Sequence, residues 1–396
     1  MILAAAQAIQ GSAPPICISV GALVGYQLLG ADKSLATAPV TGFNLGVALG
    51  AVPAAAIVRA LGQRNGFLCG AGVIAAAGMI ATFGLLHANF WIFALGLLCV
   101  GLGNSFIQQY RFAAADSAEG DFKARAISWV MVGGVLNGIL GPQIVIFTDD
   151  LLPTVKFAGS FASIVLLAAL GALILLFLPV RDKSAAAATA GPSDQPARPL
   201  SEIVRQPQFF VGLLCAIASY ALMSFVMTGA PLAMVGCGLS TDEATLGISW
   251  HVLAMFGPSF FTGLLVTRFG KERVVAVGLV LLIGCGISAL AGLHVWNFWI
   301  ALMLLGVGWN FGFIGATTMV ATSYRPSEKS RVQGLHDFVL FGSVAFASLM
   351  SGIVFNMAGW TGLNLVIFPV TGTCLVALAL LALSGRGAAR RSSALS

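Results

Sequence analysis

The sequence predicts an all-α membrane protein with twelve transmembrane helices arranged as two related bundles of six. Three observations support this prediction. Hydrophobic residues make up 58% of the 396 residues and charged residues only 9%, which lies outside the range of soluble globular domains. Apolar runs long enough to cross a bilayer recur along almost the whole chain. A polar segment divides the chain near its middle, and features on its two sides recur at a nearly constant offset.

Windows of about 19 residues place the boundaries of the spans. We expect the spans at residues 4–29, 37–58, 65–86, 90–115, 126–148, 156–179, 208–235, 246–267, 273–293, 297–322, 332–355 and 361–384. A cleavable signal peptide is the alternative interpretation of the first span, but no basic residue precedes it and the first charge is Asp32. We therefore expect a retained helix, which Pro14 and Pro15 should bend.

Basic residues between the spans segregate into alternate loops, and this predicts the orientation. The basic loops and the tail contain Arg59, Arg64, Lys123, Arg125, residues 181–205, residues 268–273, residues 325–331, Arg386, Arg390 and Arg391. The opposite loops contain only Lys33 and Lys156. Both termini should face the cytoplasm, with the chain in a bacterial inner membrane. The net charge of +6 reflects this topology and contact with anionic lipid, and it predicts no nucleic-acid partner.

The longest polar segment, residues 181–207, is rich in Ala, Pro and Ser and is a predicted flexible cytoplasmic linker. It separates a bundle at 1–180 from a second bundle at 208–396, which ends in a short basic tail.

The two halves share features in the same order. The motif "ALGQR" matches "RFGKER", which aligns Gly62 with Gly270. At nearly the same offset "KARA" matches "KSRV", and Asn104 falls on Asn310. Two parallel repeats joined by a linker are typical of transporters with a central site that alternates between the two sides.

These features resemble the major facilitator superfamily over the whole chain. "GLLVTRFGKER" is similar to that family's loop signature G-x-x-x-D-R-x-G-R/K-R/K, although Thr267 stands where the acid belongs. The first-half copy, "AAIVRALGQR", has Arg59 at that place. Gly138, Gly141 and Pro142 partly resemble the family's antiporter signature, whose trailing glycine pair is missing. The arginine that drug–proton antiporters keep early in span four is also absent, so antiport is in doubt.

The resemblance implies a cytoplasmic gate. Its candidate residues are Arg59, Gly62, Arg64, Arg268, Gly270, Arg273, Asp116, Arg125 and Arg331. A looser likeness of "DKSLATAPVTGFNLG", "QQYRFAAADSA" and "RAISWVMVGGVLNGILGP" is to a proteobacterial branch associated with uptake of riboflavin or similar vitamins.

The stretch "FIQQYRFAAAD" places an arginine in a membrane span. Asn104, Gln108 and Arg111 are four and three residues apart, so they share one helix face. An ionisable side chain in a span normally faces a cavity or a partner, because its insertion is costly. Arg111 could bind an electron-rich substrate group, with the two amides completing the site. The alternative is that Arg111 snorkels to the cytoplasmic surface or pairs with Asp116.

Asp337 is the acid inside a span, and His336 lies beside it. The pair could bind a proton on one side of the membrane and release it on the other. Alternatively, Asp337 neutralises Arg59 across the interface of the halves, and His336 is a packing residue.

Other polar and aromatic residues in spans are candidates for lining the substrate site. They are His251, Asn310, Trp309, Tyr220, Asn44, Gln10, Gln7 and Asn137. For each of them, interhelical hydrogen bonding or packing is the alternative.

No metal, cofactor or catalytic site is expected. The seven cysteines have neither metal nor disulfide spacing, and no glycine-rich run precedes a Lys-Ser/Thr pair as in a phosphate loop. We predict a monomeric secondary transporter, not an enzyme, that moves a small polar or aromatic solute, with coupling to protons. Drug or metabolite efflux is the alternative within this class. A receptor or scaffold is the alternative outside it.

Overall fold

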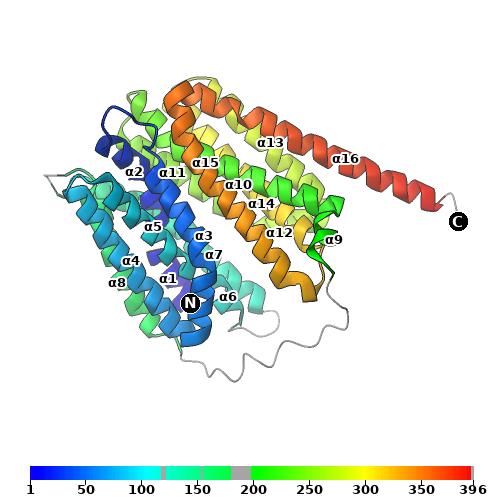
Figure 1. The fold of residues 1–396 in the computed structure, drawn as a ribbon, viewed down its shortest axis with the longest axis horizontal. Coiled ribbons are helices and arrows are strands. Elements are labelled where there is room, and N and C mark those ends of the chain that lie inside the picture. Colours follow the sequence, from blue (N-terminus) through cyan, green and yellow to red (C-terminus); the bar gives the residue numbers. More distant parts are fainter. Residues whose placement is uncertain (117–121, 153–154, 180–197, 394–396) are drawn as a thin grey trace.

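The computed structural model describes residues 1–116, 122–152, 155–179 and 198–393. Its described residues form helices joined by short connections (Figure 1). The first bundle contains α1 (Ile2–Gln10), α2 (Ala13–Leu28), α3 (Ala38–Leu61), α4 (Gln63–Leu86), α5 (Phe90–Ile107), α6 (Tyr110–Asp116), α7 (Phe122–Thr148) and α8 (Ala158–Leu176). The second contains α9 (Leu200–Val204), α10 (Pro207–Gly236), α11 (Thr241–Phe256), α12 (Ser259–Phe269), α13 (Lys271–Leu290), α14 (Val295–Ala321), α15 (Lys329–Leu365) and α16 (Ile367–Ser393).

Each predicted span lies over a helix or a pair of helices. Within the described residues, nine helical stretches are long and apolar enough to cross a bilayer, and α11 with α12 makes a tenth across a 42° bend. The stretch from Arg331 to Ser384 covers the last two predicted spans, because the chain turns at Gly359 with φ 63°. The shorter apolar helix Val132–Thr148 covers the fifth span. This arrangement is consistent with twelve spans.

Three predicted spans are interrupted within their length. The first separates into α1 and α2 at Gly11, as expected from Pro14 and Pro15. The fourth, predicted as one helix, breaks between α5 and α6 after Gln108. The eighth, also predicted as one helix, breaks between α11 and α12 at Pro258. Broken helices place backbone polar groups inside the protein, which a membrane protein tolerates only where they are buried or line a cavity.

The loops that the sequence paired as repeats adopt the same turn. Gly62 joins α3 to α4 with φ 83° and ψ 163°, and Gly270 joins α12 to α13 with φ 89° and ψ 147°. A positive φ of this kind favours glycine, which explains why both copies of the motif have one there.

The second half of the predicted linker contains ordered structure. Arg198 donates to Glu328 through Nε and Nη2, both at 2.9 Å, and the short helix α9 follows. Ile203 of α9 packs with Phe209, Val320 and Val332. Residues 181–197 of the predicted linker lie outside the described residues.

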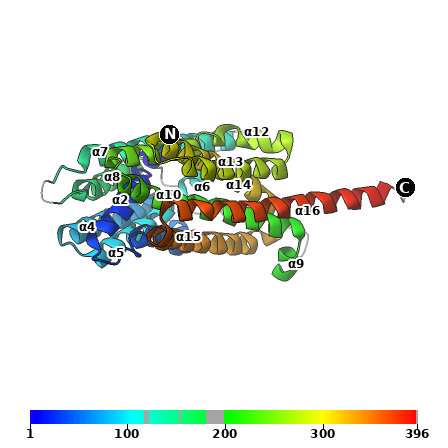
Figure 2. The same ribbon diagram turned by 90° about the horizontal axis from the view of Figure 1, so that it is seen from above.

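Each bundle has its own apolar core, and the two bundles lie side by side (Figures 1 and 2). Contact between them runs along α3 with α15, α7 with α11, and α2 with α10 and α11. We call the end at which α8 ends and α10 begins the linker end, and the opposite end the far end. Ser249 donates to the Gly138 carbonyl at 2.7 Å, and Thr37 donates to the Leu349 carbonyl at 3.4 Å. Both bonds join the bundles in the half nearer the far end.

Candidate functional site

A cavity of about 150 Å³ lies between the two bundles near the middle of the helices. Its polar lining consists mainly of carboxamide side chains, with Tyr220 and Ser224. The carboxamides are Gln7, Asn44, Asn104, Gln108 and Asn137. No charged residue in the described part of the chain lines this cavity. Such a lining can exchange many hydrogen bonds with an uncharged solute.

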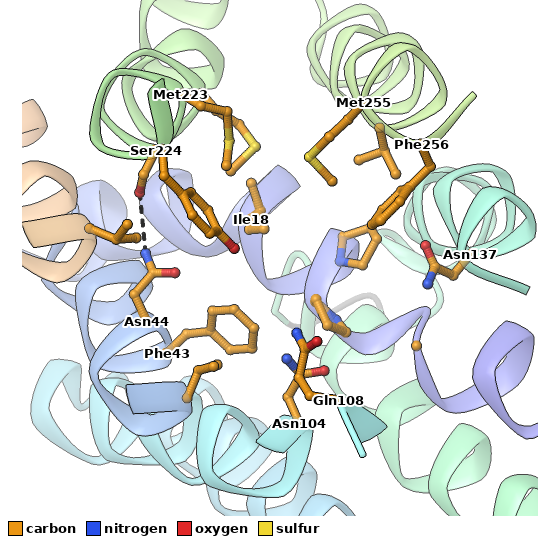
Figure 3. A pocket seen from close by; sticks show the side chains of 18 of the residues that line it. Ile18, Phe43, Asn44, Asn104, Gln108, Asn137, Met223, Ser224, Met255 and Phe256 are labelled. Carbon is orange, nitrogen blue, oxygen red and sulfur yellow. Dashed lines mark hydrogen bonds between the residues drawn. The ribbon is translucent and has the colours of Figure 1, made fainter. Parts of the chain in front are cut away.

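The first bundle supplies most of the hydrogen-bonding groups, and two of its broken helices place them. Gln7, Gly11, Pro14 and Pro15 line the cavity around the break between α1 and α2. Asn104 and Gln108 line it at the end of α5, just before α6 begins. Figure 3 shows these two amides close together, beside the Phe43 ring.

The second bundle supplies a wall of thioether and aromatic side chains, which we call the methionine wall. It consists of Met223, Met227, Met255, Phe256 and Phe341. In Figure 3, Met223 and Met255 extend into the space from two different helices. Flexible, polarisable methionines adapt to an apolar ligand and make favourable contacts with aromatic rings. The wall therefore suits the face of a flat ring.

Tyr220 joins this wall to a cluster of aromatic rings behind it. Its ring lies edge-on to Trp309 at 5.3 Å, Phe313 at 5.1 Å and Phe341 at 6.0 Å. The Trp309 and Phe313 rings stack at 5.2 Å. The sequence predicted Trp309 as a substrate-binding residue. In the structure it is buried in the layer behind Tyr220, where it packs against the residues that line the cavity without lining it itself.

Four of the predicted site residues meet at the cavity: Asn104, Gln108, Tyr220 and Asn44. They come from both halves of the chain. Asn44 of α3 donates to the Ser224 hydroxyl of α10 at 3.5 Å, which spans the two bundles beside the cavity (Figure 3).

Gln10 and His251, two of the predicted site residues, lie away from the cavity. Gln10 is fully buried inside the first bundle, where it donates to the Ala168 carbonyl at 3.3 Å and accepts from the Tyr110 hydroxyl. His251 is fully buried in the second bundle, with Nδ1 2.9 Å from the Leu302 carbonyl oxygen. For both residues, the structure agrees with the alternative of an internal hydrogen bond.

Asn310 also lies away from the cavity, although its repeat partner Asn104 lines it. Asn310 donates to the Met255 carbonyl at 2.8 Å and to the Ser259 hydroxyl at 2.7 Å. It therefore secures the break between α11 and α12, where the proline interrupts the helical hydrogen bonds.

Arg111 lies in α6, toward the linker end from Gln108, and its side chain is exposed. It interacts electrostatically with Asp337 of the second bundle. The structure thus places a guanidinium and a carboxylate on opposite bundles at the linker side of the cavity. The side chain of Asp116, the predicted alternative partner of Arg111, lies outside the described residues.

Asp337 is 57% exposed in α15, and its Oδ1 lies 3.0 Å from Nδ1 of His336. Among the described residues, no ion pair joins Asp337 to Arg59, and the alternative in which Asp337 neutralises Arg59 stays a prediction.

The predicted gate residues lie around the turns at the linker end. Arg59 and Arg64 flank Gly62, Arg268 and Arg273 flank Gly270, and Arg331 lies in the first turn of α15. The side chains of Asp116 and Arg125 are outside the described residues. The gating role of the set stays a prediction.

The methionine wall was not predicted from the sequence. Methionines are ordinary core residues of membrane helices, and nothing in their spacing separates Met223, Met227 and Met255 from other apolar positions. An isolated amide in an apolar span was the stronger signal, and it correctly indicated Gln7 and Asn137 as possible lining residues.

Comparison with known proteins places this geometry in context. A sequence model of the Major Facilitator Superfamily matches residues 2–335 and 213–395. The chain is 53% identical to the riboflavin transporter RfnT of Brucella anthropi over 392 residues, which are 98% of this chain and 96% of that protein. It is 31% identical to the uncharacterized MFS-type transporter YddS of Bacillus subtilis, covering 88% of this chain and 82% of that protein. Among solved structures, a D-xylose–proton symporter has the same fold, with a TM-score of 0.72 at 14% identity over 96% of this chain and 95% of that one.

Proposed function

The chain belongs to the major facilitator superfamily and is a multi-pass membrane transporter, and we propose that it carries riboflavin or a closely related vitamin into the cell. The observation that carries this proposal is the near full-length similarity to a riboflavin transporter. The cavity supports it, because carboxamides can bind the polar edge of a flavin while the methionine wall packs against its rings.

Transport requires the central cavity to open alternately to the two sides of the membrane. Hydrogen bonds between the bundles, such as those of Thr37 and Ser249, close the half nearer the far end. Gln108, Arg111 and Asp337 are exposed toward the linker end. The basic loops of the sequence favour a cytoplasmic location for that end, in a bacterial inner membrane. On this proposal, the arrangement is an inward-open state.

We propose that protons drive the uptake through Asp337. Its carboxylate contacts His336 and interacts with Arg111 of the opposite bundle. Protonation of Asp337 would remove its charge and weaken its attraction to Arg111. The proton would thereby change the free energy of bringing the two bundles together at the linker end. Coupled transport needs such a dependence of the conformational equilibrium on proton binding.

Flux measurements with radiolabelled riboflavin test the function and its direction. If the protein is an uptake transporter, right-side-out vesicles with an acidic exterior should accumulate more riboflavin than vesicles without the protein. A proton ionophore should abolish this accumulation. Efflux predicts accumulation in everted vesicles with an acidic interior instead. If riboflavin does not cross in either orientation while the protein is present and folded, the proposed substrate is wrong.

A further inference from the structure

Two carboxamide side chains converge on one glycine at the break of the first span. A Cβ atom built on Gly11 would lie 2.6 Å from Nδ2 of Asn137 and 2.8 Å from Nε2 of Gln7. Gln7 belongs to α1 and Asn137 to α7, so two helices present amide N–H donors at the same point. Only glycine permits this approach, because any larger residue would displace both amides.

The same segment also contains backbone acceptors without helical donors. In a regular helix the amide of residue 15 would donate to the carbonyl of residue 11, but Pro15 has no N–H. Pro14 leaves the Gln10 carbonyl without its donor in the same way. Gly11, Pro15, Gln7 and Asn137 all line the cavity, so this set is available to a solute inside it.

We infer that this set, Asn137 and Gln7 as donors with the Gly11 carbonyl as acceptor between them, binds the imide edge of the substrate. The inference rests on the proposed function. The pyrimidine ring of a flavin presents a carbonyl, an N3–H and a second carbonyl along one edge. That order, acceptor, donor, acceptor, complements donor, acceptor, donor.

The methionine wall can contact the remaining rings of the flavin. Met255 and Phe256 face the same end of the cavity as Asn137 (Figure 3). A flavin with its imide edge at Gly11 would therefore place its fused rings along the methionine wall. Asn44 lies at the other end of the cavity, where its amide bonds to Ser224, so it is less suited to hold the imide.

The test measures binding of riboflavin and of 3-methylriboflavin, whose N3 carries no hydrogen, to the full-length protein in detergent. Quenching of flavin fluorescence gives both dissociation constants. The unmodified protein should bind riboflavin about tenfold or more tightly than the methylated compound, because a site built around a hydrogen bond is left with unpaired groups.

Asn137→Leu then distinguishes imide recognition from a general loss of affinity. It should weaken riboflavin binding by about tenfold and leave 3-methylriboflavin binding nearly unchanged, since the methylated ligand has already lost that edge. Asn137→Asp, which keeps the size but removes the N–H donor, should act in the same direction. The matched control Asn44→Leu removes a carboxamide at the other end of the cavity and should weaken both ligands by the same factor.

Equal binding of the two flavins by the unmodified protein would overturn the inference. So would an Asn137→Leu variant that weakens both ligands equally, like the control. Either result leaves riboflavin transport intact. If the unmodified protein binds no riboflavin, the proposed function is wrong, and the inference about the imide edge is wrong with it.

Discussion

Thr37 at the start of α3 and Gly352 in α15 touch so closely that a Cβ on Gly352 would overlap Oγ1 of Thr37. The same Cβ would lie 3.2 Å from the Ser34 carbonyl oxygen. This contact joins the two bundles at the far end, where Thr41 also donates to the Ser348 hydroxyl at 3.4 Å. The close packing of these helices holds the two bundles together at that end.

Substitution of Gly352 should therefore open the far end. Gly352→Val would crowd Thr37 at a cost of about 1–3 kcal/mol, which disfavours the state closed at that end. We expect slower riboflavin uptake and faster amide hydrogen exchange at the start of α3. Gly342→Val in the same helix is the control, because a Cβ there meets nothing within 4 Å. Equal effects of the two variants would contradict this account of the contact.

Asp337→Asn should separate proton coupling from substrate translocation. Asparagine keeps the shape of the side chain but cannot take up a proton, so a pH gradient should no longer drive accumulation. Exchange of labelled for unlabelled riboflavin across the membrane, which needs no net proton movement, should continue. Unchanged pH-driven accumulation would show that the proton binds elsewhere.

Arg111→Gln should lower transport, because it leaves Asp337 without its electrostatic partner on the first bundle. The double variant Arg111→Gln with Asp337→Asn removes both charges together, and it should recover exchange relative to Arg111→Gln alone. Exchange flux in folded, matched samples provides the measurement. An Arg111→Gln protein with normal flux, affinity and coupling would rule out any role of this residue in the cycle.

The ion pair that anchors the linker should make stability depend on pH. Hydrogen bonds from the Arg198 guanidinium, with those from the backbone amides of Arg325 and Arg198, lower the pKa of Glu328 from 4.5 to about 2. Because the folded pKa is depressed, this stabilisation is complete above pH 4.5 and is lost as the pH falls toward 2. The melting temperature of the purified protein should fall less steeply below pH 4.5 in Glu328→Gln than in the unmodified protein. Glu202→Gln, at an exposed carboxylate near the same arginine, should keep the steeper fall.

Tyr110→Phe should destabilise the first bundle without changing substrate selectivity. The Tyr110 hydroxyl donates to the Gln10 side chain in a fully buried position, and its removal leaves that amide oxygen without the donor. We expect a loss of about 1–3 kcal/mol in the free energy of unfolding. Tyr324→Phe is the control, since the Tyr324 hydroxyl accepts from the exposed Gln333 at 3.1 Å. If Tyr110→Phe strongly changes the ratio of the riboflavin and 3-methylriboflavin affinities, Gln10 contributes to the binding site after all.

The fold was largely predictable because each of its main constraints is local in sequence. A helix that crosses a bilayer needs a continuous apolar run, and a tight turn with positive φ needs a glycine, as at Gly62 and Gly270. Pro14 and Pro15 likewise indicated the interruption of the first helix. The break after Gln108 had no such signal, because no proline lies near it.

The cavity was only partly predictable. Gln7 and Gln10 are one helical turn apart in the same apolar segment, yet Gln7 lines the cavity and Gln10 is buried in the bundle core. Asn104 and Asn310 occupy matching places in the repeats, yet one faces the cavity and the other holds a broken helix.

The sequence by itself determined that this chain lies in a membrane, which segments are long and apolar enough to span it, and that it consists of two related halves. Only the tertiary structure decided which polar side chains face the central cavity, and that a methionine wall lies opposite them. The physical reason is that lipid and protein interior are both apolar, so hydrophobic periodicity does not reveal how each helix is rotated about its axis. That rotation is set by packing between segments that are far apart in the chain.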